Sequence, residues 1–182
     1  MLSGGLTNAD TVAVGSVIEV RSGGTAAGAD VFGKLIVDSG GAASGTTIEF
    51  GGTELVSGVD SAAQIGGEQD VRGVATSATV EATGLQVVSA GGVANATVID
   101  GGGSATVLKS GTASGTIVRP GGVETVSGTD VGARISAGEQ DVFGLASGAT
   151  VFVGGDQSIE SGSTASGTTV LLGGLPVYCS NL

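Results

Sequence analysis

An aliphatic residue recurs along the chain every 15 to 19 residues, and a second aliphatic residue follows within each interval. The first column consists of Val12, Val31, Ile48, Ile65, Val80, Val98, Ile117, Ile135, Val151 and Val170. The second column consists of Val20, Val37, Val56, Val71, Val88, Val107, Val126, Val142, Ile159 and Val177. A period near 20 residues that is kept over a whole chain indicates a repeat architecture. We therefore divide the chain into ten units, each with two short apolar stretches.

Glycine pairs separate these stretches. They lie at positions 23–24, 40–41, 51–52, 66–67, 91–92, 101–102, 121–122, 154–155 and 173–174. Glycine adopts positive φ without a steric penalty, so these pairs predict tight corners. With 37 Gly among 182 residues but no glycine at every third position, the composition excludes a collagen-like chain.

The units predict an all-β fold. Gly, Thr and Val disfavour helices, and the Asn-Gly pairs typical of tight hairpins are absent. We predict a parallel β-helix, or β-solenoid, of about ten rungs of 15–19 residues, in which Val, Ile and Ala point inward and the rungs stack about 4.8 Å apart. Residues 1–10 are expected to form an N-terminal cap segment, residues 11–174 the solenoid, and residues 175–182 a C-terminal tail.

A longer repeat is superimposed on the units. The segment Gly51–Asp60 matches Gly121–Asp130, and Gly67–Val71 matches Gly138–Val142. Each pair is separated by four units, which indicates that the chain also grew by duplication of a block.

The net charge excludes some classes of binding partner. Six basic and seventeen acidic residues give a net charge of −11, which disfavours nucleic acids and anionic membrane surfaces. The chain has no His and one Cys, Cys179, so we expect no disulfide scaffold, no metal site and no cofactor. No apolar run approaches the roughly 18 residues that span a bilayer, and the first residues lack the pattern of a signal peptide. We expect this segment not to insert into a membrane and the export signal to lie outside it.

Two columns of hydroxyl residues are the main candidate sites. Successive strand residues face opposite sides, so a Thr that precedes an inward aliphatic residue is expected to point outward. Asp30, Gln64 and Arg134 interrupt this Thr column, and a Ser column precedes the glycine corners. The candidate O-glycosylation sites are Thr11, Thr47, Thr79, Thr97, Thr116, Thr150 and Thr169, with Ser22, Ser39, Ser57, Ser89, Ser110, Ser127 and Ser161. Two alternatives remain open: these residues only suit strands and turns, or the Thr column binds ice.

The acidic motif Glu68-Gln69-Asp70 and its copy Glu139-Gln140-Asp141 allow a second interpretation. Alternate strand residues share a face, so each motif presents two carboxylates, as glycoside hydrolysis or weak Ca²⁺ binding would need. The copies lie four rungs, or roughly 19 Å, apart and therefore cannot flank one bond. Duplication favours a structural or surface role, and we predict no catalytic residues.

The repeat resembles a known family. The consensus T-V-x-x-G-G-x-x-x-V-x-S-G-G-x-A-S-G is nearly complete from Thr97–Gly102 to Ser110–Gly115. It is similar to the repeat of AIDA-type autotransporter passenger domains, the self-associating adhesins of Gram-negative bacteria. The resemblance implies a secreted or surface-displayed β-helix that mediates adhesion and autoaggregation and is a substrate of a protein O-heptosyltransferase. The expected partners are further copies of the chain, a host surface and that transferase.

Two other functions remain open at this point. A polysaccharide-active β-helix enzyme would need acidic and basic side chains gathered in one groove, whereas the basic residues here are few and scattered. A passive spacer would only project other parts of a protein outward. We expect a non-catalytic adhesin segment.

Overall fold

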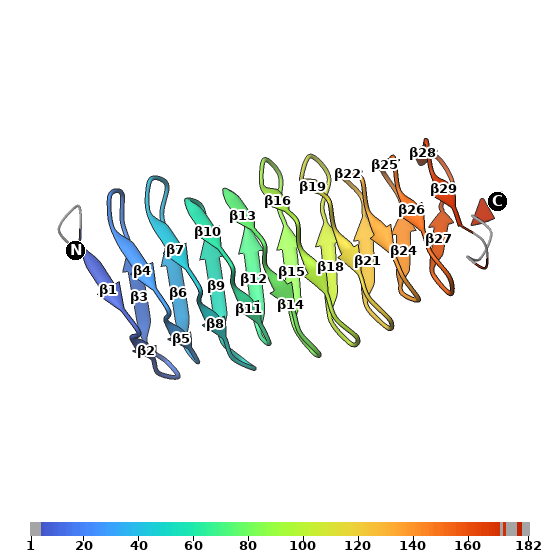
Figure 1. Cartoon of the computed structure of the whole chain (residues 1–182). Helices are drawn as coiled ribbons and strands as arrows, with labels where there is room; N and C mark the ends of the chain where they lie inside the picture. The colour runs from blue at the N-terminus through green and yellow to red at the C-terminus, as the bar shows by residue number, and fades with distance from the viewer. Residues whose placement is uncertain (1–4, 172, 174–177, 180–182) are drawn as a thin grey trace.

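The chain winds into a ten-rung coil in which each rung contributes one short strand to each of three sheets (Figure 1). The computed structural model describes residues 5–171, 173 and 178–179. Each strand pairs in parallel with the equivalent strands of the neighbouring rungs. The prediction of an all-β parallel solenoid is confirmed. No helix occurs in the described part of the chain, and hence none there could cross a membrane.

The first sheet contains the first strand of each rung. Its strands are β1 (Leu6–Asn8), β4 (Thr25–Ala27), β7 (Ala42–Ser44), β10 (Val59–Ser61), β13 (Val74–Thr76), β16 (Val93–Asn95), β19 (Thr112–Ser114), β22 (Thr129–Val131), β25 (Leu145–Ser147) and β28 (Thr164–Ser166).

The second sheet is built from two-residue strands. These are β2 (Thr11–Val12), β5 (Asp30–Val31), β8 (Thr47–Ile48), β11 (Gln64–Ile65), β14 (Thr79–Val80), β17 (Val98–Ile99), β20 (Ile117–Val118), β23 (Arg134–Ile135), β26 (Thr150–Val151) and β29 (Thr169–Val170).

The third sheet closes each rung. Its strands are β3 (Val17–Val20), β6 (Lys34–Val37), β9 (Thr53–Val56), β12 (Glu68–Val71), β15 (Leu85–Val88), β18 (Ser104–Val107), β21 (Val123–Val126), β24 (Glu139–Val142), β27 (Asp156–Ile159) and β30 (Tyr178–Cys179). Rung 1 thus comprises β1 to β3, and rung 10 comprises β28 to β30.

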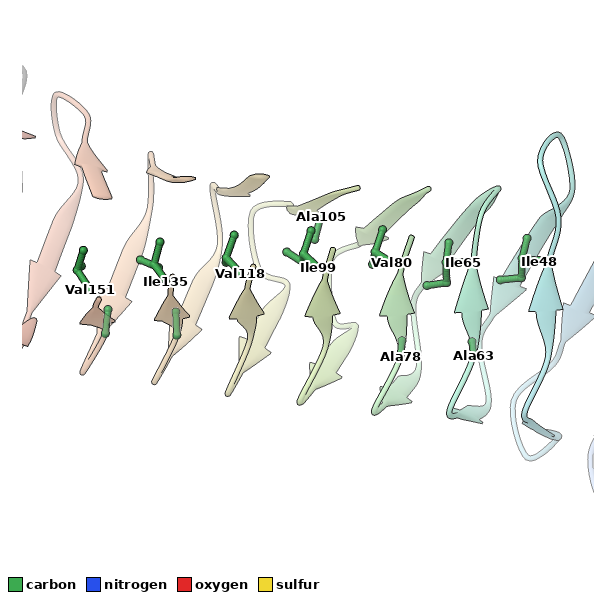
Figure 2. Packing of buried hydrophobic residues seen from close by; sticks show 12 residues of the cluster. Ile48, Ala63, Ile65, Ala78, Val80, Ile99, Ala105, Val118, Ile135 and Val151 are labelled. Atoms are coloured by element: carbon green, nitrogen blue, oxygen red, sulfur yellow. The ribbon is translucent and has the colours of Figure 1, made fainter. Parts of the chain in front are cut away.

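One aliphatic residue per rung projects from the second sheet into the interior. Figure 2 shows this column in side view, from Ile48 to Val151. Its members from Val12 to Val151 are at most 1% exposed, whereas Val170 in rung 10 is 42% exposed. Each rung covers the aliphatic side chains of its neighbours. Ile48 to Val151 form one cluster, and Val12 and Val31 pack in a second cluster with residues of rungs 1 to 3.

The predicted first column is wrong in two rungs. Val80 pairs with Ile99, and Ile99 pairs with Val118, so Val98 and Ile117 are not members of the column. The error arose because Thr97-Val98 and Thr116-Ile117 look like the Thr-Val pairs of other units. A shift of one residue moves every side chain to the opposite face of a strand.

The second predicted column lies inward at the end of each strand of the third sheet. From Val20 to Ile159 its members are buried, which confirms nine positions. Val177 lies outside the described residues. The backbone of Cys179 instead takes the next register position, opposite Ile159.

The sequence predicted two apolar stretches per unit, but each rung has three strands. The inward residue of the first sheet is usually alanine, as in Ala26, Ala43, Ala75, Ala94 and Ala113. Alanine gives a weak apolar signal, and the strands are only three residues long. The small side chain keeps this side of the core narrow.

Glycine forms corners for two different reasons. Gly51 has φ +82°, a conformation that costs other residues energy. At Gly84 a Cβ atom would lie 1.9 Å from the carbonyl oxygen of Ile65, so only glycine lets the backbone pass. Both kinds occur at the corner between the second and third sheets.

Strands also form outside the predicted boundaries of the solenoid domain, on both sides of residues 11–174. β1 lies within the expected cap segment 1–10, and β30 lies within the expected tail 175–182. The division of the chain into these three domains stays a prediction.

The corrected register predicts unequal costs at adjacent positions. Replacing Ile99 with Ala should lower the free energy of unfolding by about 2–5 kcal/mol, because it opens a cavity in the core. Replacing half-buried Val98 with Ala should cost less than about 1 kcal/mol. Urea denaturation measures both values. An equal loss in the two variants would contradict the register.

Candidate functional site

The outward threonine column runs along the second sheet. Thr47 and Thr79 flank Gln64 in register, and Thr150 pairs with Thr169. Thr11 and Thr169 are exposed, and Thr47, Thr79 and Thr150 are half-buried. These five hydroxyl residues face outward, as predicted. Whether they are modified stays a prediction.

Thr97 and Thr116 do not belong to this column. They are 2% and 1% exposed and lie inside the rod, so the expectation that they face outward is wrong. The outward positions of these rungs are held by Val98 and Ile117. Thr97 and Thr116 occupy the inward position that precedes the strand, where other rungs carry Ala63 or Ala78.

The predicted serines lie at the corners between the third sheet and the first sheet of the next rung, but they do not form one column. Ser57, Ser89 and Ser127 directly follow the strand, Ser22, Ser39 and Ser161 come one residue later, and Ser110 comes two residues later. Ser57 and Ser89 are half-buried, and the other five are exposed: Ser22, Ser39, Ser110, Ser127 and Ser161. Ser89 donates a hydrogen bond of 2.6 Å to Asp70. Ser110 has φ +67°, the left-handed conformation that glycine holds at the equivalent corners of other rungs.

A third hydroxyl column was missed by the sequence reasoning. It occupies the outward last position of the first sheet, where Ser44, Ser61 and Thr76 are in register and Ser147 pairs with Ser166. A residue with positive φ follows each, as Gly45 follows Ser44. The recurrent Ala-Ser-Gly triplet was the available signal.

A ladder of polar side chains runs through the interior of rungs 3 to 6. Gln69 donates one hydrogen bond to Glu54 Oε2 (2.8 Å) and one to Asp60 Oδ2 (3.0 Å). Gln69 Oε1 accepts from Gln86 Nε2 at 2.8 Å, and Gln86 Oε1 accepts from the Thr97 hydroxyl at 3.0 Å. The donors of Thr97 and Gln86 therefore point along the rod toward Gln69, which donates to both carboxyl groups, an arrangement in which hydrogen bonds polarise one another.

The same ladder recurs in rungs 7 to 10. Gln140 donates to Glu124 Oε2 (2.7 Å) and to Asp130 Oδ2 (3.0 Å), and it accepts from Gln157 at 2.6 Å. Thr168 donates to Gln157 at 3.0 Å. The six positions recur after 70 or 71 residues: Thr46 and Thr116, Glu54 and Glu124, Asp60 and Asp130, Gln69 and Gln140, Gln86 and Gln157, Thr97 and Thr168. The duplicated block predicted from the sequence is thus a four-rung unit with its own polar core.

Burial raises the pKa of the carboxyl groups in these ladders. The pKa of Glu54 rises to about 8, first through burial and then through repulsion by Asp60, and Gln69 and Thr46 oppose this only in part. The pKa of Glu124 rises to about 8 for the corresponding reasons. Oε1 of each Glu lacks a well-aligned hydrogen-bond partner among the described residues. A proton on Glu54 and Glu124 removes the buried charge.

The acidic motifs place their three residues on two faces. Glu68 and Asp70 share a face, as predicted, and this face is outward, whereas Gln69 between them points inward to the ladder. Asp70 forms an ion pair of 2.8 Å with Arg72. The side chains of the two ladders are buried, so they affect the stability of the fold and do not contact a ligand at the surface. In the described part of the chain no group of three or more metal-ligating side chains is present.

Comparisons with known proteins place the chain among adhesins. Residues 90–139 match the family model "Adhesin of bacterial autotransporter system, probable stalk". A similar solved structure is the "TibC-catalyzed hyper-glycosylated TibA55-350 fragment", with 30% sequence identity and a TM-score of 0.87. The likeness covers 99% of this chain and 77% of that one. No curated protein sequence matches the chain.

The buried ladders predict that acid stabilises the rod. Between about pH 4.5 and 8 the folded chain holds protons at Glu54 and Glu124 that the unfolded chain releases. The free energy of unfolding should therefore fall as the pH rises through this window, on the order of 2–5 kcal/mol per ladder.

Urea denaturation between pH 4 and 9 at constant high salt measures the slope. Replacing both Glu54 and Glu124 with Gln should flatten it between about pH 6 and 8, because the amide keeps the volume and does not titrate. Below about pH 6 a smaller slope should remain, because burial also raises the pKa of Asp60 and of Asp130 to about 6. The matched control is Glu68→Gln with Glu139→Gln, which changes outward carboxylates of the same strands. A slope that the Glu54 and Glu124 replacements leave unchanged would refute the assignment.

Proposed function

Because the chain belongs to the AIDA-type family of autotransporter passenger domains, we propose that it is a surface-exposed segment of an adhesin and not an enzyme. The observation that carries this proposal is the likeness of 99% of this chain to the glycosylated TibA fragment. The family is that of adhesins displayed by or secreted from Gram-negative bacteria.

The faces of the rod support a role in multivalent contact. Each of the three sheets presents an equivalent set of outward residues in every rung, so weak contacts can be made at many places along one rod. Such contacts give avidity without any deep pocket. We infer that the rod binds further copies of itself or a host surface in this way.

The outward hydroxyl columns are the proposed acceptors of a protein O-heptosyltransferase. Thr47, Thr79 and Thr150 present hydroxyls from one face, and the Ser44 and Ser147 positions present them from another. A transferase must reach its acceptor, so Thr97 and Thr116 are now proposed to remain unmodified. The exposed corner serines remain candidates.

Glycopeptide mapping after co-expression with a family heptosyltransferase tests the acceptors. Sugar is expected on outward residues such as Thr79 and Ser44 and not on Thr97 or Thr116. Thr79→Val keeps the β-branched shape and should remove one heptose, whereas Thr97→Val should remove none. Sugar on Thr97, or no sugar on the columns at all, would contradict the proposal.

Self-association should depend on salt. The net charge of −11 repels a second copy, and added salt screens that repulsion. Sedimentation velocity should therefore detect more assembly as NaCl rises from very low levels. A chain that stays monomeric at high concentration in every salt, with and without glycan, would argue against self-association.

A further inference from the structure

Three rungs have a short corner between the second and third sheets, and a surface recess lies over each. The corner has residues 32–33 in rung 2, 66–67 in rung 4 and 136–138 in rung 8, whereas rungs 1, 3, 5, 6, 7 and 9 have four residues there. The recesses measure about 240, 280 and 340 Å³ in the same order. Each opens between the longer corners of the neighbouring rungs.

The recess over rung 4 combines several kinds of chemical group. Its floor is the side-chain-free pair Gly66 and Gly67. Phe50, on the corner of rung 3, is 82% exposed and forms one side. The remaining side chains are Thr53, Glu68, Leu85 and Thr83, of which the first three stand in register on the third sheet.

Thr83 stands in a strained conformation at the edge of this recess. Its φ is +71°, which is unusual for a β-branched residue. The equivalent residue in every other four-residue corner of rungs 1 to 9 is a glycine with positive φ: Gly15, Gly51, Gly102, Gly121 and Gly154. The Thr83 hydroxyl donates a hydrogen bond of 3.4 Å to the carbonyl oxygen of Gly66, which holds the side chain at the recess and leaves its oxygen able to accept a hydrogen bond from a ligand.

The duplicated block contains a natural comparison. The recess over rung 8 keeps the carboxylate, as Glu139 in place of Glu68, but it lacks the other groups. The replacements are Pro120 for Phe50, Val123 for Thr53, Gly154 for Thr83 and Asp156 for Leu85. Of the two recesses over rungs 4 and 8, only the recess over rung 4 therefore has the aromatic ring and the two hydroxyls.

We propose that the recess over rung 4 binds one pyranose ring of an uncharged sugar. The C–H face of the ring packs against Phe50, because the negative face of an aromatic ring attracts weakly positive C–H groups. Its hydroxyls donate to the Glu68 carboxylate and exchange hydrogen bonds with Thr53 and Thr83. The volume is below the roughly 300–1,000 Å³ of sites for drug-sized ligands, which suits a single ring.

The charges around the recess set its selectivity. Glu68 is the carboxylate of its lining, and it repels a sugar that carries an acid group. Lys34 and Arg72 line a neighbouring hollow that shares Thr53 and Glu68, and Arg72 is already paired with Asp70. The site therefore selects uncharged over acidic rings.

The proposal deepens the adhesin function by naming a class of ligand. Its test uses the purified unglycosylated chain and no adhesion assay. Absence of sugar binding would leave the family, the acceptor columns and self-association untouched.

Titration of the ¹⁵N-labelled chain with methyl glycopyranosides of glucose, galactose and mannose tests the site. At least one should shift the amide signals of Gly66, Gly67 and Thr83 with a Kd on the order of 1 mM. Methyl glucuronide should bind more weakly than methyl glucoside. Phe50→Ala should raise the Kd at least about tenfold, and Glu68→Gln should weaken binding and reduce discrimination against the glucuronide.

The matched controls change the equivalent positions of rungs 7 and 8. Pro120→Ala and Glu139→Gln should leave binding unchanged, and circular dichroism should confirm that all variants fold. The proposal is overturned if no uncharged glycoside shifts the rung 4 signals, if Phe50→Ala binds like the original chain, or if the rung 8 signals move equally.

Discussion

Parallel backbone pairing between successive rungs is the constraint on which the rest of the structure depends. Once Val80 pairs with Ile99 and Ile99 with Val118, the alternation along each strand assigns all the remaining strand residues of these rungs to the inside or to the outside. The hydrophobic effect then acts on whole columns, because each aliphatic side chain is covered by the rungs on both sides. The same register turns Thr79 outward and buries Thr97. Proposed acceptors and core residues are thus two consequences of one pairing.

The polar ladders add a second level of order to this stack. Gln69 reaches Glu54 only if rung 4 follows rung 3 in register, and a shift would leave Glu54 buried without its donor. An unpaired buried polar group is costly, whereas alanine tolerates many neighbours. We infer that each ladder helps to specify the order of its four rungs. Its recurrence in rungs 7 to 10 means that the duplicated block carried this specification with it.

The solenoid could be predicted because aliphatic spacing and glycine corners are direct consequences of stacking. Errors occurred where one residue type fits two positions: Thr before Val suits an outward strand position and also the inward position of Thr97. The ladders were not predicted, because attention went to the two carboxylates of each motif, although alternation from inward Val71 already places Gln69 inside. The recess over rung 4 could not be predicted, since it depends on corner lengths in neighbouring rungs and on the φ of Thr83.

Cysteine accessibility at three consecutive positions tests the register most directly. In a Cys179→Ser background, the variants Thr97→Cys, Val98→Cys and Ile99→Cys each present one thiol, whose reaction with a maleimide depends on exposure. The structure predicts rapid labelling at position 98 and protection at positions 97 and 99 until denaturant is added. Labelling at position 97 that is as fast as at position 98 would contradict the register, and with it the assignment of inward and outward hydroxyls.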